Sequence, residues 1–207
     1  MKHILKSPSP TFFEDWKQNF KKNEGREPIY GDLRGAEYHR LKMHMIDEQY
    51  SLCCYCCKKI DHFNSHIEHF KPKGQYPDEA LDYKNLLASC EGYKDKRENC
   101  GHKKDNWYSD YYTVSPMDAN CESLFTYTVD GHMKASHEDT RARETIDNLE
   151  LDSNLLQRAR RSAIHMSGLF DDDFDDKRQQ LIELFSTPKD GRLEGFCVTI
   201  LYCLTNA

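Results

Sequence analysis

The sequence predicts an α+β fold in which a mainly helical chain surrounds one small segment of different character. Apolar residues recur at helical spacing on both sides of residues 53–107, whereas that segment has few long apolar runs and most of the cysteines. Such a segment cannot build a large core alone, so a crosslink has to stabilise its fold in place of apolar packing. The 207 residues suffice for one medium or two small domains, and we divide them into regions 1–50, 51–115 and 116–207.

Two helices are predicted in the N-terminal region. Residues 11–22 place four aromatic side chains on one side, and Thr11 after Pro10 suits an N-cap. A second helical pattern runs from about residue 33 to residue 50 and ends at the first cysteines. This region therefore leads directly into the segment that needs a crosslink.

The C-terminal region predicts a hairpin followed by helices. A turn at Asp130-Gly131 lies between two short apolar runs. Helical spacing returns at residues 154–169, with Asp152 or Ser153 as a cap, and again near residues 177–185. The apolar residues 191–207 fit a strand or a helix equally well.

The charge balance is acidic and uneven. The chain has 29 Lys and Arg against 35 Asp and Glu, and residues 108–207 alone hold 18 acidic against 10 basic residues. This balance argues against a nucleic-acid binder that relies on a basic face. The first ten residues lack an apolar signal core and no apolar run approaches the length of a membrane span, so we expect a soluble, cytoplasmic protein with no membrane partner.

Nine cysteines without an export signal favour metal binding over disulfides. Residues 53–57 read Cys-Cys-Tyr-Cys-Cys, which holds two overlapping C-x2-C pairs, either of which could supply two zinc ligands. Cys90 and Cys100 are the distant partners, although nine intervening residues are more than a usual zinc knuckle has. The remaining thiols, Cys121, Cys197 and Cys203, fit small buried apolar side chains.

Three further signals lie between and beside these cysteines. They are the runs His66–Lys73, Asp82–Cys90 and Cys100–Asn106. A histidine, then an asparagine, then a second histidine, framed by paired cysteines, resembles the HNH endonucleases. The resemblance implies that Cys53, Cys56, Cys90 and Cys100 bind a structural Zn²⁺. It also implies a ββα-metal core of the HNH or His-Me finger type within residues 51–115.

The same resemblance implies a role for each residue of the motif. His69 is the general base, and Glu68 and His102 are the ligands of a catalytic Mg²⁺ or Mn²⁺. Asn85, on the second strand, holds the preceding loop and orients His69. Lysines near the motif would neutralise phosphates; these are Lys71, Lys73, Lys103 and Lys104. For His62 and His66, roles as ligands or substrate contacts compete with an ordinary place on the surface.

Residues from about 40 to 165 are similar to one branch of that family, the PtuB-type HNH effectors of Septu and retron-linked anti-phage systems. The similar runs are Asp47–Gln49, Ile67–Lys73, Asp82–Cys90, Cys100–Lys104 and Thr145–Leu151. The resemblance implies an endonuclease that cuts DNA together with an ABC-type ATPase, PtuA. Two other readings remain: a zinc-stabilised module that binds nucleic acid or protein without cleaving, and a restriction or homing nuclease.

Overall fold

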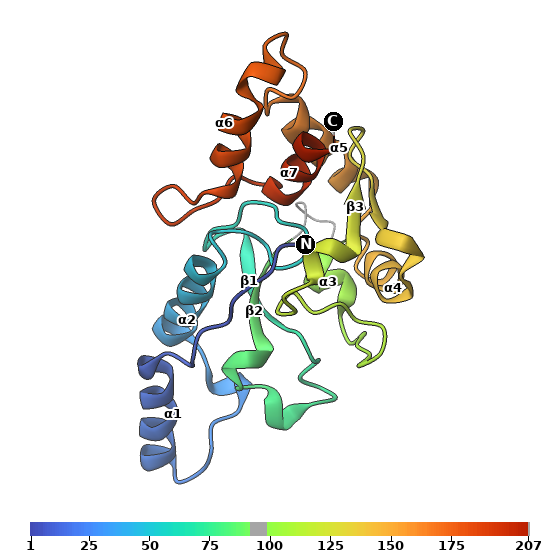
Figure 1. Ribbon diagram of the computed structural model, residues 1–207. Coiled ribbons are helices and arrows are strands. Elements are labelled where there is room, and N and C mark those ends of the chain that lie inside the picture. Colours follow the sequence, from blue (N-terminus) through green and yellow to red (C-terminus); the bar gives the residue numbers. More distant parts are fainter. Residues whose placement is uncertain (92–98, 207) are drawn as a thin grey trace.

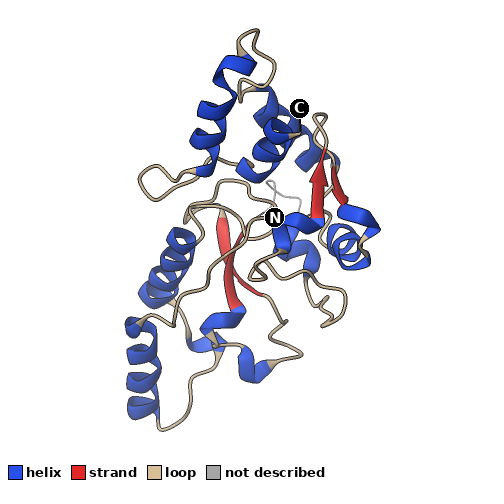
Figure 2. Cartoon of the chain, in the orientation of Figure 1, coloured by secondary structure: helices blue, strands red, loops and turns tan. Residues whose placement is uncertain are grey.

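The computed structural model describes residues 1–91 and 99–206, and it is an α+β structure (Figures 1 and 2). The helices are α1 (Thr11–Glu24), α2 (Gly35–Glu48), α3 (Cys100–Lys104), α4 (Thr140–Asn148), α5 (Asn154–His165), α6 (Phe174–Ser186) and α7 (Cys197–Thr205). The strands are β1 (Ser65–His69), β2 (Leu86–Cys90), β3 (Phe125–Tyr127) and β4 (Met133–Ala135). Figure 1 shows α1 at one end, α5 to α7 at the other, and β1, β2 and α3 between them.

The predicted helices of the N-terminal region are confirmed as α1 and α2. The predicted cap was wrong by one position, because Pro10 precedes the first helical residue and Thr11 is already inside the helix. The Pro10 carbonyl accepts from the amides of Phe13 and Glu14 at 2.9 and 3.3 Å, while its ring offers no side-chain acceptor. The extended backbone of Pro10 is what makes it suitable for the residue before a helix.

The C-terminal elements are also confirmed, and the ambiguous terminus is helical. The hairpin at Asp130-Gly131 joins β3 to β4, and α5 and α6 match the predicted helical stretches. Ser153 occupies the cap position of α5 without a side-chain capping bond. Residues 191–207 contain α7, whose side chains are buried on most sides, which explains why no helical period was visible. Helix α4 was not predicted.

Two short antiparallel strands lie at the centre of the molecule. In the β1–β2 pair, Ser65 is opposite Cys90 and His69 is opposite Leu86. Both α2 and α3 contact β2. The side chain of Gln49, just after α2, accepts from the Ala88 amide and donates to its carbonyl, each at 2.8 Å. The Gln49 side chain thus makes the pair of backbone hydrogen bonds that a third strand beside β2 would make.

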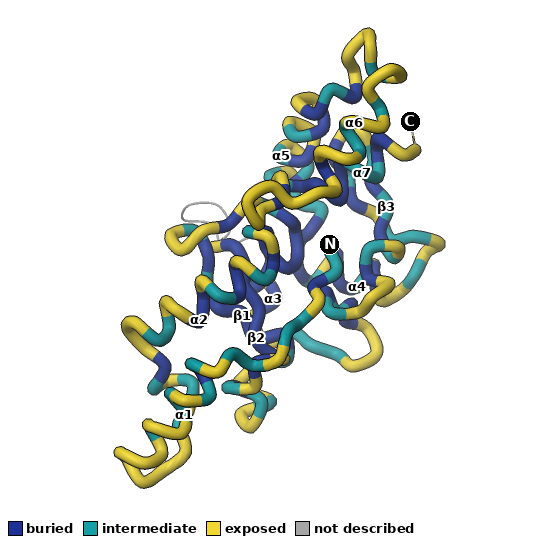
Figure 3. The backbone as a smooth tube through the Cα atoms, turned by 60° about the vertical axis from the view of Figure 1, so that its left-hand side comes forward, coloured by how far each residue is buried: buried dark blue, intermediate teal, exposed yellow. Residues whose placement is uncertain are grey.

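The buried apolar side chains of the described residues form two main clusters. Figure 3 shows that many buried positions of the chain lie around β1, β2 and α3. The larger includes side chains from Met1 to Val198 and surrounds the central strands. The smaller joins α5, α6 and α7; its buried members are Ile164, Leu169, Phe185, Ile200, Cys203 and Leu204. No helix within the described ranges is long and apolar enough to cross a bilayer.

Candidate functional site

Four cysteines meet in a buried cluster beside β2. The Sγ atoms of Cys53, Cys56, Cys90 and Cys100 all lie within 4.8 Å of one another, and the Cys56 and Cys90 sulfurs are 3.8 Å apart. Sulfurs about 2.3 Å from a central zinc stand roughly 3.8 Å apart in a tetrahedron. The four thiols could therefore hold one metal ion. The second C-x2-C pair is not part of the cluster: Cys54 and Cys57 are buried, and burial raises the pKa of each thiol.

Local backbone structure brings these sulfurs together. The Cys57 amide donates to the Cys53 carbonyl at 3.1 Å, closing a tight turn, and the Cys90 amide donates to Cys53 Sγ at 3.3 Å. Asn99 Nδ2 donates to Cys100 Sγ at 3.0 Å. Cys100 has a left-handed φ of 58°, which costs a non-glycine residue on the order of 1–2 kcal/mol. N–H donors aimed at sulfur, and a cysteine kept at a strained position, both fit metal-bound thiolates.

The three scattered cysteines are buried away from this cluster. Burial raises the pKa of Cys121 and Cys197 to about 12 and that of Cys203 to about 11. Cys203 belongs to the apolar cluster of α5 to α7. Their surroundings fit the predicted role as small apolar side chains.

A cleft of about 200 Å³ lies between the end of β1 and α3. It brings together three residues of the predicted motif, Glu68, His69 and His102, with Lys73. Its remaining lining residues are His66, Ile67, Pro72, Gly101, Asp105 and Asn106. Both polar and charged groups thus converge on one opening beside the cysteine cluster.

His69 ends β1 and is held in one orientation. Its Nε2 lies 3.0 Å from the Ala80 carbonyl oxygen, which can only accept, so Nε2 carries the proton. The ring of Tyr30 packs edge-on at 4.3 Å between centroids. Burial lowers the pKa of His69 to about 4, and the positive charge of Lys73 adds to this effect. The imidazole is therefore neutral near pH 7, with an unprotonated Nδ1.

Glu68 is buried and tied to a buried cation. Its Oε1 accepts from Tyr55 Oη at 3.1 Å and lies 3.1 Å from Lys104 Nζ. Burial alone would raise the pKa of Glu68, but His66 and then Lys104 lower it below its ordinary value. Lys104 also donates to the His69 carbonyl at 2.9 Å. The Lys104 ammonium therefore lies inside the site, where it contacts the Glu68 carboxylate and the His69 carbonyl.

Asn85 closes the loop that follows β1. It lies in the turn before β2, not on the strand as predicted, because Asp82 caps a short 3-10 turn at Tyr83–Asn85. Asn85 Oδ1 accepts from the Lys71 amide at 2.7 Å, and Nδ2 donates to the carbonyls of Lys71 and Glu79 at 3.0 and 3.2 Å. One side chain thus joins both ends of the loop that presents the Ala80 carbonyl to His69.

His102, in the first turn of α3, belongs to a second cluster of possible ligands. Its Nε2 is 2.7 Å from Glu91 Oε2, and its ring lies 4.3 Å from that of His66 between centroids. His66, Glu91 and His102 can each place one ligand atom within 4.8 Å of the others. A Cβ on Gly101 would lie 2.4 Å from Glu68 Oε2 and 2.7 Å from His66 Nε2, so a larger residue would displace both side chains.

The four predicted phosphate-binding lysines differ in their surroundings. Lys73 lines the cleft, with its ammonium 4.7 Å from the centre of the Tyr30 ring. Lys71 pairs with Glu79 at 2.8 Å and Lys103 with Glu150 at 3.3 Å. Lys104 is the buried partner of Glu68 described above. Lys73 is thus the best placed of the four to meet a substrate.

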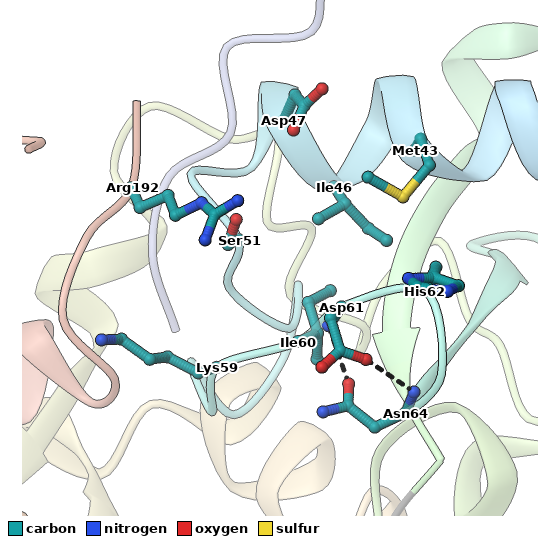
Figure 4. Close-up of a pocket in the computed structure, with 10 residues that line it drawn as sticks. All are labelled: Met43, Ile46, Asp47, Ser51, Lys59, Ile60, Asp61, His62, Asn64 and Arg192. Atoms are coloured by element: carbon teal, nitrogen blue, oxygen red, sulfur yellow. Dashed lines mark hydrogen bonds between the residues drawn. The ribbon is translucent and has the colours of Figure 1, made fainter. Parts of the chain in front are cut away.

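A second hollow, of about 290 Å³, lies between α2, the loop before β1 and the turn near the C-terminus (Figure 4). It contains His62 but none of the residues predicted to be catalytic. Of its lining residues, Lys59 pairs with Glu194 at 2.7 Å, and Asp61 and Asn64 bond each other. This hollow offers no comparable set of catalytic groups.

Sequence reasoning missed Glu91, Gly101 and Tyr55 as parts of the site. Glu91 directly follows a cysteine of the buried cluster, and that position beside a ligand is the only signal the sequence offered. Gly101 stands between Cys100 and His102, where a glycine suggests close approach of another group. Tyr55 lies between the first two cluster cysteines.

Comparison with known proteins bears on this arrangement. No protein-family model matches the chain. It is 28% identical over 159 residues to a retron Vc95 protein of Vibrio cholerae named as an HNH endonuclease, over 71% of this chain and 76% of that protein. It is 35% identical over 99 residues to a retron Ec83 protein of Escherichia coli, also named as an HNH endonuclease, over 44% of this chain and 38% of that protein.

The Septu protein PtuB of Bacillus thuringiensis is 27% identical over 113 residues, which are 54% of this chain and 40% of PtuB. The matched part thus spans most of the first relative and less than half of the other two. These relationships support an endonuclease of the HNH type, related to the PtuB-type effectors of defence systems.

Proposed function

We propose that the chain is a metal-dependent endonuclease that hydrolyses phosphodiester bonds, most simply those of DNA. In this proposal β1, β2 and α3 form the ββα-metal core, with the cysteine cluster as its structural Zn²⁺ site. The observation that carries the proposal is His69, a neutral imidazole fixed through Nε2 at the floor of a polar cleft. A module that only binds has no need of such a base.

His69 would act as general base through its free Nδ1. Water attacks phosphorus, its proton passes to Nδ1, and the bond from phosphorus to the leaving oxygen breaks, with that oxygen taking up a proton. The bond from Nε2 to the Ala80 carbonyl keeps the ring oriented and stabilises the imidazolium that forms. Asn85, by closing the loop that carries Ala80, would be a positioning residue.

Glu68 and His102 would hold the catalytic Mg²⁺ or Mn²⁺. A divalent ion at this place would offset negative charge on the phosphate and the leaving oxygen. The donor set fits, because the carboxylate is kept ionised by Lys104 and the absence of a Cβ at Gly101 leaves room beside Glu68 Oε2. Lys73, Lys71 and Lys103 would contact neighbouring phosphates, whereas Lys104 would position Glu68 and His69.

We further propose that an ABC-type ATPase of the PtuA kind assists this nuclease in anti-phage defence. The support is the resemblance to PtuB-type effectors and the charge of residues 108–207, which would repel a phosphate backbone. Exposed apolar side chains also lie on α6 and on the segment between α5 and α6, among them Leu184, Met166 and Phe170. A partner that covers this acidic part would favour capture of DNA.

The catalytic proposal is tested by plasmid cleavage with Mg²⁺ or Mn²⁺, with and without EDTA. His69→Ala should lower the rate by about 10²–10⁴-fold while zinc content and melting temperature stay unchanged. His62→Ala, at a histidine outside the cleft, is the matched control and should cleave normally. Wild-type cleavage by His69→Ala would refute the assignment, and a wild-type chain that binds DNA but never cleaves it would favour the binding module.

The partner proposal is tested by measuring cleavage and DNA affinity across a salt series, for the chain alone and for a complex with the ATPase. The complex should cleave faster and bind DNA more tightly, and its affinity should fall more steeply as salt rises, because phosphate contacts then outweigh the acidic repulsion. Equal activity and equal salt dependence in the two samples would show that the ATPase plays no part in substrate capture.

A further inference from the structure

His66 carries a buried nitrogen that the cleft chemistry described above does not use. Its Nδ1 is shielded from solvent and has no hydrogen-bond partner. Glu91 Oε1 lies 3.5 Å from this nitrogen, too far for a good hydrogen bond. A buried imidazole nitrogen left unpaired costs free energy, so its position requires an explanation.

Three separate segments aim ligand atoms at the same place. His66 comes from β1, Glu91 follows β2, and His102 comes from α3. Their ligand atoms lie within 4.8 Å of one another, although the residues are up to 36 positions apart in the chain. β1 and β2 are paired and α3 contacts β2, so the fold sets the spacing of the three backbone positions, with Glu91 as the exposed member of the set.

An ion pair between Glu91 and His102 explains only part of this geometry. That pair, at 2.7 Å, satisfies His102 Nε2 and one carboxylate oxygen. It leaves the second carboxylate oxygen directed at the unpaired His66 Nδ1 from 3.5 Å. A cation between the two imidazoles and the carboxylate would satisfy all three groups at once.

We propose that His66, Glu91 and His102 together bind one divalent transition-metal ion, such as Mn²⁺ or Co²⁺, in preference to Mg²⁺. Imidazole nitrogen is a good ligand for first-row transition metals, whereas Mg²⁺ prefers oxygen ligands and retains its water. Two imidazoles and one carboxylate therefore select against Mg²⁺. The inference rests on the proposed nuclease function for its role in cleavage: because both proposals use His102, this ion is the catalytic one, with His66 and Glu91 as further ligands. Ion binding can nevertheless be tested independently of cleavage.

The experiment measures binding of Mn²⁺ and of Mg²⁺ to the zinc-loaded full chain. Loss of the free Mn²⁺ electron paramagnetic resonance signal and calorimetry should both give one Mn²⁺ per chain beyond the zinc. Mg²⁺ should bind at least about tenfold more weakly. Glu91→Gln, which keeps the shape of a half-exposed side chain, and His66→Ala should each weaken Mn²⁺ binding by about tenfold or more.

Matched controls separate this result from a general loss of structure. His62→Ala and Glu79→Gln change a histidine and a glutamate outside the cluster and should bind Mn²⁺ as the wild type does. His69→Ala should also bind Mn²⁺ normally even though it does not cleave, so failure of the nuclease proposal would be visible separately. Zinc content and melting temperature verify that each variant is folded.

Two results would overturn the inference. One is Mg²⁺ binding as tight as Mn²⁺ binding in the wild type. The other is unchanged Mn²⁺ affinity in both His66→Ala and Glu91→Gln, which would mean that the ion is held by other residues.

Discussion

The cysteine-and-cleft region, residues 52–91 with 99–106, and the C-terminal helical region, residues 154–205, are stabilised in different ways. The strands β1 and β2 and the helix α3 have five residues each, and their surroundings contain buried charged groups such as Glu68 and Lys104. The helices α5 and α6 have 12 and 13 residues and meet α7 through apolar side chains. The first region combines buried apolar side chains with buried ion pairs and the cysteine cluster, whereas the second is held by apolar packing.

This difference explains how a small site can carry many polar groups. A buried ion pair contributes little net stability, because each charge loses its hydration on burial. Metal binding to thiolates supplies folding free energy without a large apolar core. The helical region needs no such crosslink, because it buries apolar surface along three helices. The two regions should therefore respond differently to the same kinds of perturbation.

Removal of a cysteine ligand should have the largest effect and should be confined to the first region. Structural zinc sites are worth roughly 10–16 kcal/mol in apparent binding free energy, so Cys100→Ser should release most of the zinc and abolish the fold of the cleft. Elemental analysis and thermal melting measure both effects. Cys203→Ser is the control, since Cys203 lies in the apolar cluster of α5 to α7. It should retain one zinc per chain, and equal zinc loss in both variants would contradict the assignment of the ligands.

Breaking the buried ion pair should have the next largest effect. Lys104→Met leaves Glu68 with a buried charge and no cation, which typically costs about 3–5 kcal/mol. Urea denaturation measures the change in the free energy of unfolding. Lys103→Met, next to it in sequence, loses only an exposed pair with Glu150 and should cost about 0–1 kcal/mol. Equal costs would show that the pair with Glu68 is not buried in solution.

A core truncation tests the helical region by itself. Ile200→Ala removes a buried side chain from α7 and should destabilise the protein by about 2–5 kcal/mol through lost contacts and a cavity. Zinc content and Mn²⁺ affinity should stay at their wild-type values below the melting temperature. A variant that loses zinc at the same time would show that the two regions unfold as one unit.

The sequence was most informative where a pattern is local. Helices α1, α2, α5 and α6 show one apolar face each, and their spacing predicted them within a few residues. The cluster cysteines were identified from tight spacing and from the family pattern. Helix α4 was missed because its buried face consists of Ala142, Thr145 and Ile146, which give only a weak apolar signal.

The rest of the candidate site depends on tertiary structure and had no local pattern. Glu91 meets His102 only because β2 and α3 are brought together. Lys104 looked like a surface lysine in a basic run, yet the fold buries it against Glu68 and the His69 carbonyl. A charged side chain such as Lys104 is buried where the fold places a group of opposite charge beside it. Sequence spacing does not specify that partner.

The smallest expected effect concerns a residue that supports the cysteine cluster without binding the metal. Asn99 Nδ2 donates to Cys100 Sγ at 3.0 Å and lies 3.7 Å from Cys90 Sγ, whereas its buried Oδ1 has no partner. Asn99→Ala therefore removes an N–H donor to sulfur together with an unsatisfied oxygen, so the fold should lose little stability. Supporting bonds of this kind are typically worth about 10–100-fold in metal affinity. The variant should carry one zinc per chain but release it to a chelator at a lower chelator concentration than the wild type. Asn148→Ala, whose amide bonds only to Glu144 on α4, should release zinc as the wild type does. Identical release from all three proteins would show that the cluster holds its metal through the four thiolates alone.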